Sequence, residues 1–347
     1  MSENKKENDK IKTENINDTY KFEVLCELKA KKLHHSKTVN TFNVFNSINN
    51  ILCLIYSNGG YSIILYNLID NKKMTEIKIA NDEFISTFRH ILDKNNKRDL
   101  IISISDPNNS LKLWNINKCE CLFYLKNIYQ HVNLFSACFL NDNNNNNQIY
   151  IITGNSVDIE PFKLFDLNGS FVKDIININK FVAFIDIYYK NKIFIISGNF
   201  NNVQSIDYYE NKVYHVYKAY KGYLFLNVCI KEEKEIIKII GSSCNGYINI
   251  WNFYNGEILN IIEVNSFIRP FCFDFWDDNY LIVGNDNYNI ELIHLKEKKP
   301  PIILFSHINL LFNIEKIIHP KFGICLVCKD AIGRIFIYNQ VNNNSQK

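Results

Sequence analysis

The chain has 347 residues, a formal net charge of +3, and 47% apolar and 14% aromatic residues. Because the charge is nearly balanced, net charge alone cannot account for binding to nucleic acid or to a membrane surface. The apolar and aromatic content is sufficient for a large hydrophobic core. No apolar run approaches the roughly 20 residues that a membrane-spanning helix needs.

The polar, charged segment 1–19 is predicted to be a disordered tail, and it resembles neither a signal peptide nor a transit helix. We therefore expect a cytoplasmic protein, a nuclear protein or both, and not a secreted one. Asparagine is unusually abundant, with 53 residues. The ten cysteines are expected to be reduced, buried thiols, because nothing in the sequence indicates export.

A first strand is predicted at 20–28. Phe22, Val24, Cys26 and Leu28 alternate with mostly polar residues there, which is the period of a half-buried strand.

A motif then recurs seven times, about every 45 residues. A short apolar run after a polar turn ends in an aromatic residue or Ile, and a small polar residue or His follows. The seven anchor pairs are Tyr66-Asn67, Trp114-Asn115, Phe165-Asp166, Ile206-Asp207, Trp251-Asn252, Ile293-His294 and Tyr338-Asn339. A β-type repeat of this length predicts a propeller with one small sheet, or blade, per repeat. In the fourth blade, Tyr208 is an alternative anchor to Ile206.

The fifth repeat shows the four strands of a blade, here called a to d, most clearly. Strand a is predicted at 223–230, b at 236–241, c at 247–251 and d at 258–262. In the third repeat, the Asn-rich segment 141–148 separates strands a and b. We expect it to be an exposed a–b loop insertion, because such a run cannot form a core.

The last repeat lacks a fourth strand of its own. Only NQVNNNSQK follows Tyr338, whereas the strand at 20–28 has no blade. A ring closes when no sheet edge is left unpaired, so the two should pair. The sequence thus predicts an all-β, seven-bladed propeller of four-stranded antiparallel blades at 20–340, with a disordered tail at 341–347.

These repeats resemble those of the WD-repeat β-propeller superfamily, whose repeat ends in Trp-Asp and often opens with Gly-His. The matching residues are Trp114 and Trp251, Asp166 and Asp207, and three histidines 31 to 34 residues before their anchors, namely His35, His131 and His307. The literal pair Trp276-Asp277 lies instead in a predicted a–b turn. The Asp that the family places in the b–c turn is missing from most repeats.

Catalytic and metal-binding patterns are weak. Cys325 and Cys328 have half of a zinc-site spacing, but positions three apart on a strand point to opposite faces. Cys119 and Cys121, assigned to a d strand, have no nearby His or Cys partner. Gly241–Gly246 joins two strands, unlike a nucleophile elbow, and the three repeat histidines are expected to be packing residues. We expect no catalytic residue, no metal and no cofactor.

The resemblance implies that the d–a connections surround one mouth of the ring. They are rich in basic residues, namely Lys31, Lys32, His34, His35, Lys37, Lys180, Lys218, Lys221 and Arg269, against Asp82 and Glu83. The alternative explanation is scattered solvated charge. The predicted partner-binding residues are Arg269, Lys221 and Tyr220 near the centre, with Phe267 and Lys218. Lys298, in a c–d loop, is expected on the opposite face.

Ser266–Pro270 departs from the Phe-Arg-Arg-Gly signature of phosphoinositide-binding propellers, so no membrane partner is expected. The leading hypothesis is a non-catalytic protein–protein interaction scaffold, a subunit of an intracellular multiprotein complex that binds other proteins, including acidic peptide segments. The alternative is a non-catalytic RNA-binding partner subunit of an RNA-modifying or RNA-processing enzyme. A hydrolase is a third hypothesis, but nothing places a base near a nucleophile.

Overall fold

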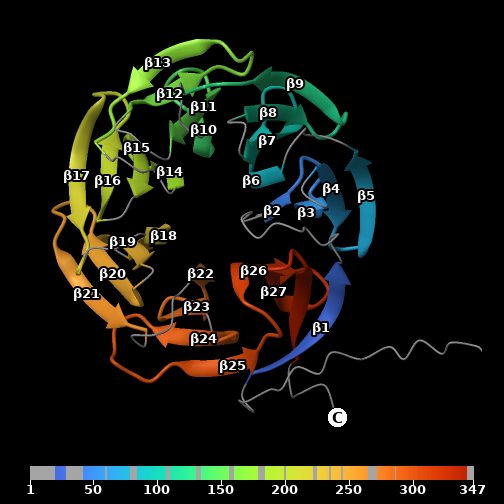
Figure 1. Cartoon of the computed structure of the whole chain (residues 1–347), viewed down its shortest axis with the longest axis vertical. Coiled ribbons are helices and arrows are strands. Elements are labelled where there is room, and N and C mark those ends of the chain that lie inside the picture. Colours follow the sequence, from blue (N-terminus) through green and yellow to red (C-terminus); the bar gives the residue numbers. More distant parts are fainter. Residues whose placement is uncertain are drawn as a thin grey trace, which may run out of the picture.

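Seven four-stranded antiparallel sheets form a ring in the computed structural model of the chain (Figure 1). The structure describes residues 20–28, 42–58, 61–78, 84–106, 110–129, 134–155, 160–178, 184–198, 201–221, 225–233, 236–243, 245–264, 272–285 and 287–341. None of these residues lies in a helix, so no helix among them could span a membrane. The predicted seven-bladed, all-β architecture is confirmed.

Each blade is a meander whose strands follow in chain order from the centre outward, except the last. The strands of blades 1 to 4 are β2 (Phe42–Asn46), β3 (Leu52–Asn58), β4 (Ser62–Asn67) and β5 (Lys72–Ile77); β6 (Phe84–Asp93), β7 (Arg98–Asp106), β8 (Ser110–Asn115) and β9 (Glu120–Leu125); β10 (Leu134–Asp142), β11 (Gln148–Asn155), β12 (Phe162–Phe165) and β13 (Phe171–Ile175); β14 (Phe184–Tyr189), β15 (Ile193–Gly198), β16 (Asn202–Asp207) and β17 (Lys212–Lys218). Those of blades 5 to 7 are β18 (Phe225–Glu233), β19 (Ile236–Ser243), β20 (Tyr247–Asn252) and β21 (Ile258–Glu263); β22 (Cys272–Phe275), β23 (Tyr280–Gly284), β24 (Asn289–His294) and β25 (Ile302–Ser306); β26 (Leu311–His319), β27 (Gly323–Asp330) and β28 (Ile335–Val341), with β1 (Lys21–Leu28) outermost.

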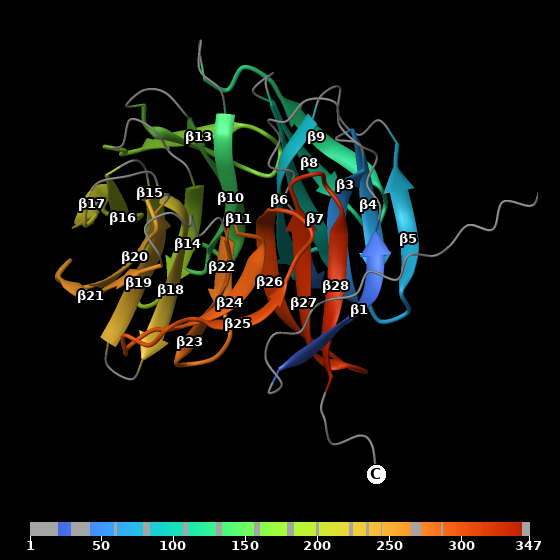
Figure 2. The ribbon, with the colours of Figure 1, turned by 60° about the horizontal axis from the view of Figure 1, so that its bottom comes forward.

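The ring is closed by the first strand, as predicted. Strand β1 pairs antiparallel with β28 from Lys21 opposite Val341 to Leu28 opposite Ile335. Figures 1 and 2 both place β1 along the outer edge of the last blade. Phe22 is completely buried and packs against Trp276 and Phe305 of blade 6. The closing strand therefore contributes core as well as backbone pairing.

The anchor residues occupy equivalent places in the c strands. Each lies opposite a Leu or Ile of strand b, as Trp251 lies opposite Ile239 and Tyr338 opposite Leu326. In blades 1 to 5, the d strand bulges beside the anchor. Such a bulge bends and twists the outer strand. In the fourth blade the anchor position is held by Ile206, which pairs with Ile195 in β15, whereas Tyr208 lies in the turn after β16.

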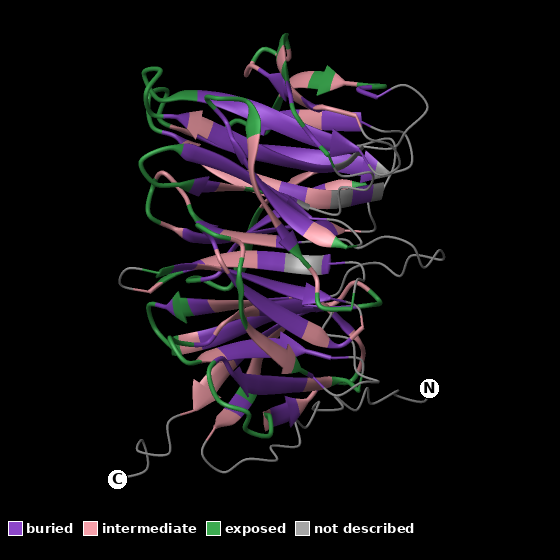
Figure 3. Ribbon diagram, turned by 90° about the vertical axis from the view of Figure 1, so that its left-hand side faces the viewer, coloured by how far each residue is buried: buried purple, intermediate pink, exposed green. Residues whose placement is uncertain are grey.

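The buried apolar residues that the structure describes form seven clusters, one at each boundary between neighbouring blades. Figure 3 shows the buried strands stacked blade on blade, with exposed residues concentrated in turns and at the rim. Cys325 packs into the cluster of blades 7 and 1, and Cys328 into that of blades 6 and 7. They face opposite sides of β27, as predicted, so they cannot share a metal ion.

Two expectations need correction. Only residues 143–147 form the Asn-rich turn, because Asn141 and Asp142 extend β10. Asp142 is buried and accepts a 2.7 Å hydrogen bond from the Tyr209 hydroxyl of blade 4, so it belongs to the packed structure. Two thiols expected to be buried, Cys119 and Cys121, are exposed. Cys119 lies in the turn before β9 and Cys121 near the start of that outer strand, which faces solvent.

Candidate functional site: a groove between blades 5 and 6

An open groove of about 910 Å³ lies between the outer parts of blades 5 and 6. Its described lining comes from the connection after β17, from β20 and β21, and from β24, β25 and the loop between them. The lining residues are Tyr220, Lys221, Tyr247, residues 260–264, Glu291, residues 297–301 and Ile303. The groove thus brings together segments that are some 80 residues apart in the sequence.

The first end of the groove is built by a d–a connection that blade 5 holds in place. The buried Asn249 side chain accepts a 3.0 Å hydrogen bond from the Tyr220 amide through Oδ1. The Asn245 amide donates to the Lys221 carbonyl at 2.9 Å. Lys221 has a φ of 54°, a left-handed conformation that costs energy for a residue with a Cβ atom. Two asparagines of blade 5 therefore fix the backbone of an exposed, strained turn.

Lys221 and two tyrosines form an aromatic corner at this end. The Lys221 ammonium lies 5.4 Å from the ring centroid of Tyr220 and 5.3 Å from that of Tyr247. The two rings are 5.5 Å apart and nearly perpendicular, at 76°. Lys221 Nζ donates to the Tyr247 hydroxyl at 3.3 Å, which donates to Glu263 at 3.3 Å. The hydrogen bond to Tyr247 raises the pKa of Lys221.

The second end of the groove is the c–d loop of blade 6, which contains Pro300 and Pro301. Lys299 pairs with Glu297 at 2.6 Å, and this contact lowers the pKa of Glu297 and raises that of Lys299. The Asn260 side chain of β21 donates to the Leu295 carbonyl at 2.9 Å. This end is therefore fastened to blade 5.

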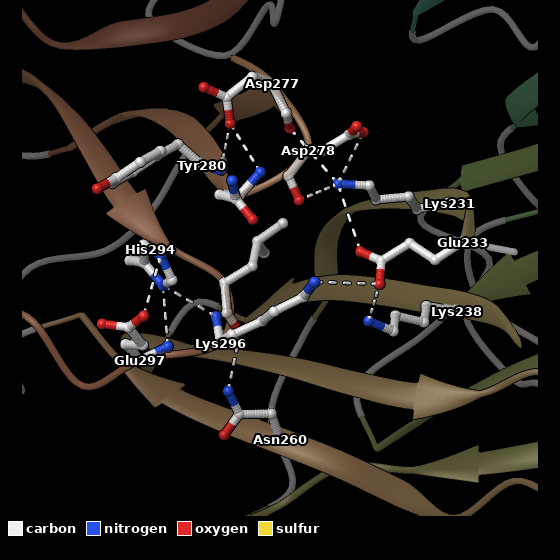
Figure 4. A network of polar contacts seen from close by, with 12 residues as sticks. Lys231, Glu233, Lys238, Asn260, Asp277, Asp278, Tyr280, His294, Lys296 and Glu297 are labelled. Atoms are coloured by element: carbon white, nitrogen blue, oxygen red, sulfur yellow. Dashed lines mark hydrogen bonds and ion pairs between the residues drawn. The ribbon is translucent and has the colours of Figure 1, made fainter.

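A polar network continues from that end along the boundary of the two blades (Figure 4). Lys231 of β18 reaches across to the turn of blade 6, and its Nζ lies 2.5 Å from the Asp278 carbonyl and 3.5 Å from a Glu233 oxygen. Glu233 also accepts from Lys238 at 2.7 Å and lies 3.6 Å from Lys296 of blade 6. The Lys231 contact with the Asp278 carbonyl and the Glu233–Lys296 ion pair cross from blade 5 to blade 6 and hold the two blades together.

The described charges that line the groove are equal in number: Lys221, Lys298 and Lys299 against Glu263, Glu291 and Glu297. Glu291 differs from the rest because it is only 6% exposed, and burial raises its pKa. Neither Glu263 nor Glu291 forms an ion pair with a described cation. The two carboxyl groups without a direct ion pair to a described cation therefore lie on the blade 5 edge, where Tyr247 links Glu263 to Lys221, and on the groove floor.

The predicted partner-binding residues lie in different places relative to the groove. Tyr220 and Lys221 both line the groove, and they are exposed. Lys218 is exposed but does not line it, and its carbonyl accepts from the Trp251 indole at 2.9 Å. Phe267 and Arg269 lie outside the described residues, as do the basic and acidic d–a residues named from 31 to 37, at 82 and 83, and at 180.

Lys298 lies in a c–d loop, at the end of the blades opposite to the d–a connection that holds Tyr220, yet both residues line the same groove. The groove runs along the side of the ring between the d–a end and the c–d end of the blades. A ligand filling it would meet both residues, so Lys298 cannot serve as an uninvolved control.

A repeated contact escaped the sequence analysis. The c-strand residue two positions before the anchor holds the preceding d–a connection: Lys163 Nζ donates to the Ile128 carbonyl at 2.9 Å, and Gln204 and Asn249 accept from the amides of Ile178 and Tyr220 at 3.4 Å and 3.0 Å. The available signal was a polar residue two positions before the anchor, which is flanked by apolar residues in β12 and β20. Lys112 and Glu291 occupy the same position in blades 2 and 6.

No group of three or more His, Cys, Asp or Glu side chains within the described ranges could hold a metal ion. His307 is buried, its Nδ1 lies 3.1 Å from the Asn309 carbonyl oxygen, and it packs edge-on against Phe336. Burial lowers its pKa. The hydrogen bond and the ring contact with Phe336 give His307 a packing role, as expected from its place in the repeat.

Further ionisable groups lie on the inner strands. Burial raises the pKa of Glu315 of β26 to about 8, the nearby Asp274 adds to this, and the Val44 amide and Arg89 oppose it. Asp274 of β22 accepts a 2.7 Å hydrogen bond from the Lys316 amide of the next blade. These carboxyl groups contact the inner strands of neighbouring blades, which is a structural role.

No model of a known protein family matches the chain. A search of curated proteins likewise finds no match. The seven-bladed architecture therefore stands on the strand pairing and on the seven repeats themselves.

Proposed function

We propose that this protein is a non-catalytic protein–protein interaction scaffold, a subunit of an intracellular multiprotein complex, and that its chain is a divergent member of the WD-repeat superfamily. The propeller architecture is compatible with that superfamily, and Trp114 and Trp251 stand at its Trp position. Propellers commonly serve as interaction platforms. A fold does not dictate function, so the proposal depends on the site.

The observation that carries the proposal is the open groove between blades 5 and 6. Its lining combines two tyrosines, two prolines and exposed lysine side chains on a rigid frame. Tyrosine is enriched at interface hot spots because it combines a large contact area with a hydrogen-bonding hydroxyl, at a low cost in side-chain entropy. The contacts of Lys231 with the Asp278 carbonyl and of Glu233 with Lys296 join the two blades beside the groove.

The described groove lining contains equal numbers of lysines and glutamates, which limits what its charge indicates about the type of partner. Charge alone favours neither an acidic peptide segment nor an RNA backbone at this groove. Protein binding through aromatic and apolar contacts with a polar rim requires no net charge. We therefore place the RNA-binding alternative among the outcomes of the test.

The test is affinity purification of the tagged full-length protein with quantitative mass spectrometry. We expect a set of proteins to copurify with the wild type and with Lys94→Glu, a matched exposed-lysine control in blade 2. The double variant Tyr220→Ala, Lys298→Glu should lose them while keeping its melting temperature. Unchanged capture by the double variant would place docking elsewhere.

A second measurement addresses the alternative. Fluorescence anisotropy of the purified protein with a 20-nucleotide single-stranded RNA at 50 mM and 200 mM salt should detect no tight complex. Tight, strongly salt-dependent binding would replace the scaffold proposal with the RNA-binding one, because release of counterions makes phosphate recognition salt-sensitive.

A further inference from the structure

The aromatic corner formed by Tyr220, Tyr247 and Glu263 already holds a cation, the ammonium of Lys221. The ammonium lies within 5.4 Å of both ring centroids, and the Tyr247 hydroxyl links it to the Glu263 carboxylate. An ammonium over the face of an aromatic ring within about 6 Å is attracted by the ring quadrupole. Two rings at 76° with a carboxylate behind them have the chemistry of a receptor for an alkylammonium.

The occupant of this corner is weakly held. Lys221 and Glu263 are exposed, and the contact has no buried ion pair to support it. An exposed cation–π contact is worth only a few-fold in an equilibrium constant, so a second ammonium can displace the first. Asn245 and Asn249 hold the Lys221 turn by its backbone, so the side chain can leave without moving the turn.

The corner opens into the groove rather than into bulk solvent alone. Tyr220, Tyr247 and Glu263 all belong to its lining, and the floor beyond them carries the buried carboxyl group of Glu291. Glu263 and Glu291 form no direct ion pair with a described lysine or arginine, and Glu263 is linked to Lys221 through the Tyr247 hydroxyl, whereas Lys299 at the far end pairs with Glu297. The near end of the groove therefore complements a positive charge on its ligand.

We propose that Tyr220, Tyr247 and Glu263 bind a lysine side chain of an extended partner segment lying in the groove, and that Lys221 fills this place in the free protein. The proposal rests on the proposed scaffold function, because it names the kind of side chain that the docking groove recognises. Lys221 acts as an internal competitor, so partner binding requires its displacement.

The test uses the full-length protein and a small probe, Nα-acetyl-lysine amide, titrated by NMR. We expect the Lys221→Ala variant to bind the probe at least about three-fold more tightly than the wild type, because the competitor is gone. Adding Tyr247→Leu to Lys221→Ala should abolish this binding, and adding Glu263→Gln should weaken it. The neutral analogue Nα-acetyl-norleucine amide should not bind.

Tyr254→Leu in the Lys221→Ala background is the matched control. Tyr254 is another tyrosine of blade 5, 43% exposed, whose ring centroid lies 5.8 Å from the Lys190 ammonium, and it is not part of the described groove lining. Probe binding should survive this change. The proposed lysine receptor would be refuted if wild type and Lys221→Ala bound the probe with equal affinity, or if binding survived Tyr247→Leu.

The two proposals fail separately. Partner capture that is lost in the groove variants together with unchanged probe affinity refutes the lysine receptor and leaves the scaffold standing. Probe binding that follows the expected order together with unchanged partner capture supports the receptor chemistry and moves the docking surface of the complex elsewhere.

Discussion

Val24 of strand β1 lies directly opposite Tyr338 of strand β28, although the two residues come from opposite ends of the chain. Tyr338 is the seventh anchor of the repeat, and the strand bulges between Val24 and Cys26 beside it. The pairing supplies the d strand that the seventh repeat lacks. The stability of the whole ring therefore depends on strand β1.

Deleting residues 1–28 should remove cooperative thermal unfolding or cause aggregation, because it exposes the edge of β28 and the core beneath Phe22. The milder change Phe22→Ala should cost about 3 kcal/mol of unfolding free energy, since the side chain is completely buried. Urea denaturation measures this. Deleting residues 1–15 is the control and should be nearly silent; a 1–28 deletion that melts like the full chain contradicts the closure.

Glu315 should make the protein less stable as the pH rises. Burial raises its pKa to about 8 in the folded state, whereas an ordinary glutamate has a value of 4.5. Between these values the folded state binds more protons than the unfolded state, so stability falls as the pH rises through that window. Glu315→Gln should weaken the pH dependence of the unfolding free energy in this window and increase stability above pH 8. The partial exposure of the Glu315 side chain reduces the size of both effects. Glu120→Gln, at an exposed position, is the control for denaturation measured from pH 5 to pH 9.

Lys329 should make the protein more stable as the pH rises, the opposite of the effect of Glu315. It is only 2% exposed, its Nζ has no hydrogen-bond partner among the described residues, and burial lowers its pKa from 10.5 to about 7. The folded state binds fewer protons between these values, so stability rises with pH through that window. Lys329→Met should stabilise the protein at pH 7 by at least about 1 kcal/mol, because it removes a buried unsatisfied donor. A loss of stability in this variant, against an unchanged Lys94→Met control, would show that the ammonium has a partner.

The Asn-rich turn should tolerate shortening only within its exposed part. Replacing residues 143–147 with Asn-Gly should change the unfolding free energy by less than about 1 kcal/mol. Asp142→Ala should cost more, about 1 to 2 kcal/mol, because its carboxylate accepts hydrogen bonds from Tyr209 and from the Asn144 amide. Melting curves of both variants compare the two effects directly, and equal losses would contradict the boundary at Asp142.

The sequence by itself determined the fold, because the fold is repeated locally. Anchors such as Trp114 and Trp251 recur at the spacing of one blade, and strand alternation at 20–28 identifies the missing d strand. Cys325 and Cys328 were assigned correctly to opposite faces, because the two-residue period of a strand fixes side-chain direction without tertiary information.

The tertiary structure alone decided the groove. Tyr220, Tyr247 and Lys298 belong to three separate connections and strands, and only the packing of blade 5 against blade 6 brings them to one surface. The same holds for Asp142, whose partner Tyr209 lies in the next blade, and for the corner that holds Lys221. Periodicity specifies which face of a strand a side chain occupies, but contacts across a blade boundary depend on the twist, bulges and turn lengths of both sheets, and no local pattern encodes these together.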